Sequence, residues 1–576
     1  MPRAMVVEGR LNVEKLEKCF TLLIRRHETL RTSFETIGDK IVQRVNESVN
    51  FKLNCFELGF IENQEKVVDN IVRDFVKAFD LNKAPLLRVG LIKVEEKKHI
   101  LMFDMHHIIS DGVSMGILTN EFVNIYEGNK LEKLRIQYKD YSKWQNSLLK
   151  SDVMQEQKKY WINRFLDKIP VLNMPTDFQR PLMQSFEGEN ISFKLDKELT
   201  EKLRQILKET GSTMYMVLLS GVNILLSKYS GQEDIIVGSP IAGRPHADLE
   251  KIIGMFVNTL AMRNYPEGSR TYEEFLKEVK ENALKAYENQ DYQFDDLIEK
   301  LSITRDISRN PLFDVMFTMQ NIDSDETELK GLLFKVYKQD HKVAKFDLTF
   351  SASEMEENIM LNLEYSTKLY KRETIERMIE HFVNILKAVV ADTKIKLSEI
   401  EMITEEEKHK LLYEFNDTKA DYPRDKTIHE LFEEQVEKTP DNIAVVFEDK
   451  EITYRELNER ANRLARTLRE KGVKADSIVG IMVERSFEMI VGIIGVLKAG
   501  GAYLPVDSEY PVNRIRYIFE DSKINILLVQ SDLLNKVIFN GIIIDLTDEK
   551  VYVKDKANLE NVNVPKDLAY IIYTSG

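Results

Sequence analysis

The sequence contains little cysteine, no long apolar run and no excess of positive charge. Cys19 and Cys55 are the two cysteines among 576 residues, which excludes a disulfide framework and a cysteine-based zinc site. No apolar stretch reaches the roughly 20 residues that a membrane span needs. Residues 1–4 lead directly into a strand-like run, so we expect no signal peptide. The formal net charge of −14, with both signs interspersed, argues against general nucleic-acid binding. We therefore expect a soluble, cytoplasmic protein with neither nucleic acid nor membrane as a partner.

Hydrophobic periodicity predicts an α/β protein. The length of 576 residues suggests three to four compact units. Apolar residues spaced three and four apart predict helices at 13–26, 67–79, 199–208, 214–229, 272–288 and 371–391. Short apolar runs predict strands at 100–105, 191–195, 235–238 and 345–350. Cys19 lies on the apolar face of the first helix, which favours a packing role for its side chain.

A second region is set apart by a charged segment. Turn signals at residues 416–418 and a proline at position 423 indicate an interdomain linker, which we place at 396–425. Beyond it the pattern predicts a strand at 479–483 and a helix at 489–497. Gly500 and Gly501 follow that helix and fit its C-terminal end. The sequence thus predicts a separate α/β region at 426–576.

Residues 105–115, Met-His-His-Ile-Ile-Ser-Asp-Gly-Val-Ser-Met, carry the strongest chemical signal. A predicted strand ends in a short loop with His106, His107, Asp111 and Gly112, and a helical pattern follows. Loops that end strands commonly hold functional residues, and histidine can exchange a proton near neutral pH. Adjacent side chains on an extended chain diverge, so we expect at most one histidine to face a substrate. A purely structural role is the plainer alternative for either ring. A metal site is disfavoured because the two adjacent histidine side chains diverge and no cysteine cluster is present to complete a ligand set.

The pattern His-His-x-x-x-Asp-Gly resembles the signature of the condensation domains of nonribosomal peptide synthetases. Further segments resemble core motifs of that family in the same order, namely residues 26–34, 138–144, 237–244, 255–263, 292–297 and 305–313. The resemblance covers roughly residues 1–395. It implies two α/β lobes at 1–145 and 146–395, each built like a chloramphenicol acetyltransferase monomer. They would form a V, with the histidine loop at the hinge of a tunnel. The family's first motif is missing, so we expect the first lobe to lack its first helix.

The region 426–576 is similar to the start of an amino-acid adenylation, or AMP-binding, domain. Residues 497–507, Leu-Lys-Ala-Gly-Gly-Ala-Tyr-Leu-Pro-Val-Asp, match a core motif of that family, and residues 510–515 continue it. Thr574, Ser575 and Gly576 resemble the beginning of the family's ATP phosphate loop. Because the sequence does not continue through that loop, the resemblance implies a truncated subdomain that activates no amino acid. ATP and magnesium would serve only a complete adenylation domain.

The resemblance implies amide formation between two carrier-bound substrates. An upstream carrier domain would bring an acyl or peptidyl thioester, and a downstream carrier domain the amine of an aminoacyl thioester. Phosphopantetheine arms of the carriers would hold both, so the condensation domain itself binds no cofactor and no metal. Four residues are expected at the site. His107 acts as a general base or positions the amine, and the Gly112 N–H meets the developing oxyanion. His106 supports the loop, as does Asp111, paired with Arg263.

Four alternatives share parts of this pattern. An epimerisation domain carries the same histidine motif but normally follows a carrier domain, and a heterocyclisation domain replaces the histidines by an aspartate. A free acyltransferase using coenzyme A would have no reason to lead into an adenylation region. A non-catalytic scaffold fragment is the alternative from a different class.

Four residues outside the histidine loop are expected to have structural roles. Arg31 and Arg309 are expected to support the fold by bridging carboxylates or carbonyls. Trp144 and Trp161 are expected to pack in the core or between the lobes. Ser110 and the Arg-His-Glu-Thr-Leu-Arg-Thr motif at 26–32 favour an L-configured donor.

Overall fold

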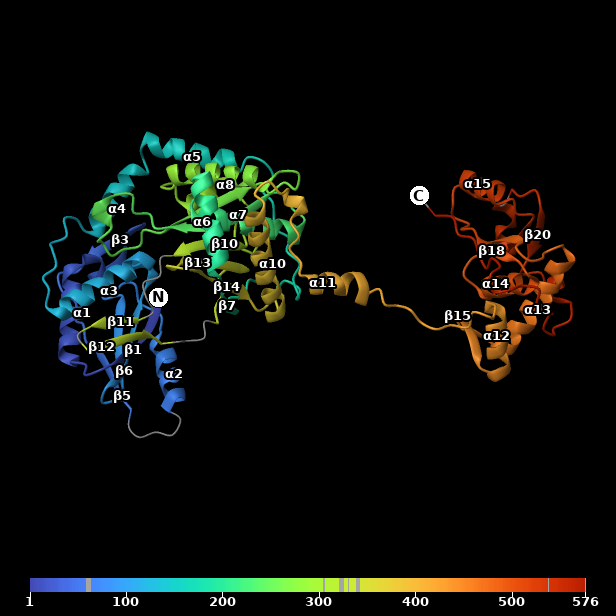
Figure 1. Ribbon diagram of the computed structural model, residues 1–576, viewed down its shortest axis with the longest axis horizontal. Helices are drawn as coiled ribbons and strands as arrows, with labels where there is room; N and C mark the ends of the chain where they lie inside the picture. The colour runs from blue at the N-terminus through green and yellow to red at the C-terminus, as the bar shows by residue number, and fades with distance from the viewer. Residues whose placement is uncertain are drawn as a thin grey trace. The chain divides into compact units, whose positions relative to one another are not determined.

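The computed structural model describes residues 1–58, 64–303, 306–320, 326–329, 331–337, 342–536 and 538–574. The chain divides into two compact units, Met1–Asn416 and Asp417–Gly576 (Figure 1). The first unit contains two six-stranded sheets, and the second contains a four-stranded sheet. Each sheet is packed with helices, so the prediction of an α/β protein with a two-lobed first region is confirmed.

The first sheet has the strand order β11-β12-β1-β6-β5-β4. Its strands are β1 (Pro2–Glu8), β4 (Asn54–Glu57), β5 (Leu87–Glu95), β6 (Lys98–Met105), β11 (Glu326–Leu329) and β12 (Leu332–Val336). Neighbouring residues of a strand face opposite sides. Leu91 and Leu101 therefore join the core under α1 (Val13–Arg26) and α3 (Gly112–Glu127), whereas Ile92 and Ile100 pack against α2 (Gln64–Phe75).

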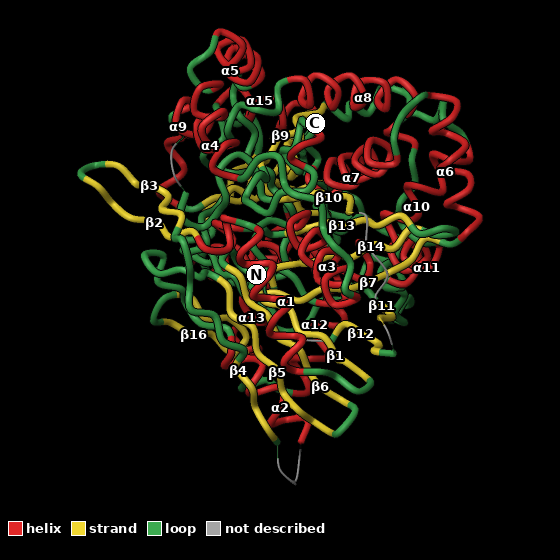
Figure 2. The backbone as a smooth tube through the Cα atoms, turned by 90° about the vertical axis from the view of Figure 1, so that its left-hand side faces the viewer, coloured by secondary structure: helices red, strands yellow, loops and turns green. Residues whose placement is uncertain are grey.

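Two β-hairpins lie outside the expected arrangement of one sheet per lobe built from consecutive segments of the chain. Strands β2 (Thr32–Ile37) and β3 (Lys40–Val45) form a separate two-stranded sheet that projects from the first lobe (Figure 2). The β11–β12 hairpin comes from the later part of the chain, yet β12 pairs antiparallel with β1, with Val7 opposite Phe334. Phe334 enters the first lobe's core. The segment expected to form the second lobe, 146–395, thus contributes a hairpin to the first sheet.

The second sheet has the order β7-β14-β13-β10-β8-β9. Its strands are β7 (Gly188–Leu195), β8 (Ile235–Ile241), β9 (Asn258–Asn264), β10 (Val315–Gln320), β13 (Leu348–Glu354) and β14 (Ile359–Ser366). The helices that contact these strands are α7 (Met214–Ser230), α8 (Tyr272–Glu288), α9 (Phe294–Leu301) and α10 (Arg372–Ala391). Helix α7 is buried on nearly all sides, as expected of an apolar helix in the middle of a layer. Helices α5 (Asp152–Arg164) and α6 (Lys197–Thr210) also belong to the second lobe, whereas α4 (Tyr138–Leu148) contacts the 3-10 turn Glu28–Arg31 of the first lobe.

The connection between the units is shorter than the expected linker of 396–425. Leu397 and Ile400 are buried in the core of the second lobe, and α11 (Glu405–His409) follows them. The ring of His381 on α10 bonds Glu407 of α11 at 2.7 Å, which ties that helix to the lobe. The residues from 411 to 425 are exposed throughout.

None of the described helices alone is long and apolar enough to cross a bilayer, and only α6 and α7 taken together, as a pair bent by 107°, have the length and composition of a span.

The second unit has a parallel sheet of order β18-β17-β19-β20 and a hairpin of β15 (Ile443–Phe447) and β16 (Lys450–Thr453). The sheet strands are β17 (Ile478–Met482), β18 (Ala502–Pro505), β19 (Ile526–Val529) and β20 (Ile542–Asp545). One face packs against α13 (Tyr454–Glu470) and α14 (Phe487–Ala499), and the other against α15 (Val512–Ser522). Helix α12 (Ile428–Lys438) packs on α13 and α14. Helix α14 ends at Gly500, whose φ of 107° suits glycine, as the sequence predicted.

Candidate functional site

The loop between β6 and α3 carries both histidines. His106 caps a short 3-10 turn, His107–Ile109, and its Nδ1 accepts a hydrogen bond from the N–H of Ile108 at 3.1 Å. Its ring meets the Phe79 ring edge-on, with the centroids 6.1 Å apart. Burial lowers the pKa of His106, and the nearby N-terminal ammonium and His107 lower it further. These contacts favour a neutral, supporting His106.

His107 differs from its neighbour in exposure. Its side chain is exposed, whereas His106 is half-buried and Ile109 and Ser110 are buried. The backbone carbonyl of His107 accepts a hydrogen bond from the Ser110 N–H at 3.2 Å, so the turn fixes the backbone that carries the ring. Of the two rings, that of His107 is the one that an external substrate can readily reach.

Asp111 and Gly112 start helix α3. The Asp111 carboxylate caps the helix by accepting the Ser114 N–H at 2.7 Å. Gly112 occupies the first helical position, where the N–H has no intrahelical partner. The space beside its Cα is open, with no heavy atom within 4 Å of an added Cβ. An anionic oxygen could therefore approach this helix N-terminus.

Asp111 pairs with Arg244, and the predicted pairing with Arg263 is wrong. Arg244 Nη2 donates to Oδ1 and Oδ2 of Asp111 at 3.0 and 3.1 Å, and the two side chains are 4% and 0% exposed. Arg263 on β9 instead donates from Nε and Nη2 to Asp234 at 2.9 and 2.7 Å. Asp234 comes directly before β8, the antiparallel neighbour of β9, so it lies beside Arg263. The sequence pointed to Arg244 only as the last residue of the motif at 237–244.

The Asp111–Arg244 pair is one of several bonds between the two lobes. Phe256 donates its N–H to Asp111 Oδ2 at 3.1 Å, and the Arg244 guanidinium stacks on the Phe256 ring at 3.9 Å. Ser114 donates from Oγ to the Gly254 carbonyl at 2.9 Å and accepts the Gly254 N–H at 3.1 Å. These polar groups are buried and bonded on both sides, so the histidine loop is held rigidly against the second lobe.

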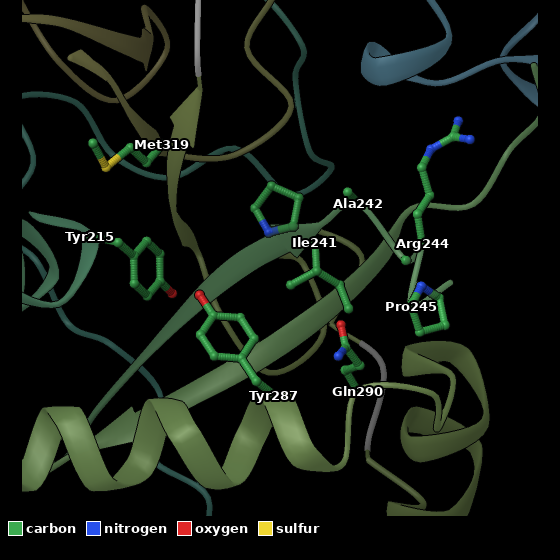
Figure 3. Close-up of a pocket in the computed structure, with 10 residues that line it drawn as sticks. Tyr215, Ile241, Ala242, Arg244, Pro245, Tyr287, Gln290 and Met319 are labelled. Carbon is green, nitrogen blue, oxygen red and sulfur yellow. The ribbon is translucent and has the colours of Figure 1, made fainter. Parts of the chain in front are cut away.

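A cavity of about 380 Å³ lies in the second lobe beside this junction (Figure 3). Arg244 belongs to its wall, but the cavity-lining residues do not include His107; they are Tyr215, Pro240, Ile241, Ala242, Gly243, Arg244, Pro245, Tyr287, Gln290 and Met319. The sequence did not reveal this cavity, because its residues come from four separate elements.

Comparison with known proteins assigns the chain to a family. The family described as Condensation domain matches residues 1–412, and that described as AMP-binding enzyme matches residues 432–576. Gramicidin S synthase 2 of Brevibacillus brevis is 54% identical over 580 residues, covering 100% of this chain and 13% of that protein. The chain belongs to the condensation-domain family of nonribosomal peptide synthetases.

Other relatives give the same family. Bacitracin synthase 3 of Bacillus licheniformis is 53% identical over 580 residues, covering 100% of this chain and 9% of that protein. The chain thus spans about a tenth of the length of these relatives. A solved four-domain nonribosomal peptide synthetase bound to AMP and glycine has a TM-score of 0.83, with 22% identity over 100% of this chain and 45% of that chain. That likeness shows a shared fold.

The condensation domain is therefore followed by part of an AMP-binding domain, as the sequence motifs predicted. Near the end of that part, Arg514 Nη2 donates to the carbonyl of Thr574 at 2.9 Å. Ser575 and Gly576 lie outside the described residues. Their expected role in an ATP phosphate loop stays a prediction.

The arginines and tryptophans outside the loop have mixed outcomes. Arg31 donates to the Asn46 carbonyl at 2.5 Å and Arg309 pairs with Asp314, so both support the fold as predicted. Trp161 is buried and donates to the Asn289 carbonyl at 2.7 Å. Trp144 is 48% exposed, so its expected burial is wrong: α4 turns only Tyr141 fully inward. Among the described residues, no group of three or more His, Cys, Asp or Glu side chains is arranged to hold a metal ion.

Proposed function

We propose that the first unit joins an acyl or peptidyl thioester to the amine of an aminoacyl thioester, with His107 as the residue that handles the proton. One observation carries this assignment: His107 is the exposed ring of the pair, on a loop that the buried Asp111–Arg244 ion pair fixes in place. The family membership of the chain supports the reaction type.

The chemistry needs alignment and one proton transfer. The neutral amine attacks the thioester carbonyl, a C–N bond forms, and the carbonyl oxygen becomes an oxyanion. His107 accepts the ammonium proton or orients the amine, and the Gly112 N–H offers a hydrogen bond to the oxyanion. The C–S bond then breaks and the leaving thiolate takes up a proton. Alignment of two bound reactants can contribute about 7–11 kcal/mol.

The proposed partners are an upstream and a downstream carrier domain, each presenting its substrate on a phosphopantetheine arm. A tunnel between lobes 1–145 and 146–395 would give both arms access to one site. ATP and magnesium belong to a complete AMP-binding domain, where Thr574, Ser575 and Gly576 would begin the phosphate loop. We expect the synthetase to work in the cytoplasm.

The decisive experiment measures amide product by mass spectrometry after mixing the chain with carrier-bound donor and acceptor. His107→Ala should lower the rate by about 10²–10⁴-fold, the usual contribution of a positioned base. If the unfolding midpoint of this variant is unchanged, the loss of rate reflects a missing catalytic group and not a damaged fold. A rate within a few fold of wild type would refute the role of His107 and favour a non-catalytic scaffold.

Gly112 offers a matched pair of variants for the oxyanion role. Gly112→Ala keeps the backbone N–H, and nothing crowds the new methyl group. Gly112→Pro removes the N–H at the first helical position, where proline is well tolerated, and Asp111 already has the extended backbone that a following proline requires. We expect the alanine variant to stay active and the proline variant to lose about 10²–10³-fold in rate. Equal rates for the two variants would remove Gly112 from the mechanism.

A further inference from the structure

The cavity in the second lobe is built from four elements. Tyr215 comes from α7, Met319 from β10 and Tyr287 from α8, and residues 240–245 continue β8. Its volume of about 380 Å³ lies within the range of small-molecule sites. In Figure 3 the hydroxyl groups of Tyr215 and Tyr287 point toward each other, with Met319 above them and Ile241 beside them.

The two phenols that line this cavity are neutral. The Tyr215 hydroxyl donates to Ser239 Oγ at 2.8 Å, so its proton is already used. Burial raises the pKa of Tyr215, and the neighbouring Tyr287 phenol adds to that rise; burial also raises the pKa of Tyr287. Both phenols are therefore uncharged at physiological pH. Aromatic faces, a thioether and aliphatic carbons make up the rest of the wall around the Gln290 amide.

Among the described residues of the wall Arg244 alone is charged, and its Nη1 and Nη2 groups bond residues outside the cavity. Its guanidinium bonds Asp111 and also donates to the carbonyls of Leu249 and Ile252, each at 2.6 Å. Figure 3 shows this side chain running away from the two phenols. An ionised group that entered the cavity would meet no free counter-charge among the described lining residues, and burying an unpaired charge is costly.

The cavity wall is joined mechanically to the histidine loop. Gly243 has a φ of +61°, and a Cβ there would lie 2.0 Å from the Phe256 carbonyl oxygen. The backbone of the cavity wall therefore packs closely against Phe256. Phe256 in turn donates its N–H to Asp111, which caps α3 next to the histidines. The cavity wall and the histidine loop thus both contact Phe256.

We propose that this cavity binds an uncharged, bulky side chain, aromatic or long aliphatic, of one of the two thioester substrates. The inference rests on the proposed condensation function and narrows its substrate class. Side chains that carry a charge are disfavoured because the part of the wall that the structure describes offers phenols, an amide and a thioether but no free counter-ion.

The test is equilibrium binding of unreactive pantetheine conjugates to the full chain, measured by calorimetry. An amide replaces the thioester, and the attached residue is phenylalanine, glutamate or lysine, either N-acetylated to mimic the donor or with a free amine to mimic the acceptor. Either the donor mimics or the acceptor mimics should occupy the cavity. Within that series, we expect the phenylalanine conjugate to bind at least about tenfold more tightly than the glutamate and lysine conjugates. Equal affinities within both series, or no binding of either phenylalanine conjugate, would overturn the inference.

Two variants test whether the phenylalanine conjugate binds in this cavity. Met319→Trp fills the cavity and should lower the affinity for the phenylalanine conjugate by about tenfold or more. Met355→Trp, at a partly exposed position in the turn after β13, is the control and should change nothing. Equal losses in both variants, or none in Met319→Trp, would contradict the inference.

The experiments distinguish a failure of the proposed condensation function from a failure of the proposed side-chain site. His107→Ala should lower the rate of amide formation by about 10²–10⁴-fold yet keep the preference among conjugates, since His107 does not line the cavity. If the preference is found but the wild-type chain forms no amide, the condensation function falls while the neutral site stands. If amide forms with His107 dependence but no preference appears, the cavity inference falls alone.

Discussion

Replacing Arg244 by methionine should strongly destabilise the first unit, because Asp111 would remain buried without its cation. The Asp111 side chain is 0% exposed and that of Arg244 is 4% exposed. Removing one partner of such a pair typically costs about 3–5 kcal/mol. The N–H groups of Ser114 and Phe256 would still bond the carboxylate. We therefore expect a loss near the lower end, about 3 kcal/mol.

Tryptophan fluorescence during urea unfolding measures this loss in the first unit alone. Both tryptophans of the chain, Trp144 and Trp161, lie in that unit. The midpoint should fall while the slope with urea stays constant, the sign of a stability change. Arg25→Met, on the exposed side of α1, is the control and should stay within about 0.5 kcal/mol of wild type.

A double-mutant cycle with Asp111→Asn distinguishes the two candidate arginines. Asp111 and Arg244 should show a coupling energy of about 2 kcal/mol, whereas Asp111 and Arg263, which share no partner, should couple by less than about 0.5 kcal/mol. A wild-type midpoint for Arg244→Met, or a larger coupling to Arg263, would refute the assignment of the ion pair.

Three further predictions concern other buried groups. Gly238→Ala should destabilise the second lobe by about 1–3 kcal/mol in the same urea assay, because the new Cβ would lie 2.1 Å from the Phe313 ring; an unchanged midpoint would contradict this packing. Burial and the neighbouring Asp347 raise the pKa of Asp314 to about 6, above its unfolded value of about 3.9. This carboxyl therefore stabilises the fold below about pH 4, and that contribution is lost as the pH rises through about 6. The wild-type midpoint should thus fall more steeply than that of Asp314→Asn between these values, and parallel pH profiles would be the contrary result. Glu433→Gln should cost the second unit about 3 kcal/mol, because it leaves the buried Lys498 ammonium unpaired. The protection of α14 amides against hydrogen exchange should fall in this variant. It should recover at high pH, because burial lowers the pKa of Lys498 and the neutral amine leaves no unpaired charge; unchanged protection would argue against the pair.

Local signals in the sequence predicted much of the fold. The spacing of apolar residues gave α1 and α8 with the bounds that the structure has, because each has a side-chain cap, Asn12 and Thr271, at its start. Gly500 marked the end of α14 for a conformational reason that is local to one residue. The histidine loop was likewise recognisable, since its residues lie within eleven positions of one another.

Long-range pairings could not be predicted in the same way. Arg244 and Arg263 both end motifs that follow the histidine loop, and only the antiparallel pairing of β8 with β9 puts Arg263 beside Asp234. The cavity at Tyr215 and Tyr287 needs four elements to meet. The pairing of β12 with β1 joins residues 333–336 to residues 5–8, and no periodicity encodes that choice.

That last pairing has a consequence for synthesis on the ribosome. Translation adds about 5–20 residues per second, so tens of seconds pass between the emergence of β6 and that of β12. Throughout this wait β1 presents an unpaired backbone edge, which invites strand addition from other chains. A nascent chain arrested before residue 326 should therefore aggregate or recruit chaperones, even though the histidine loop has already been made.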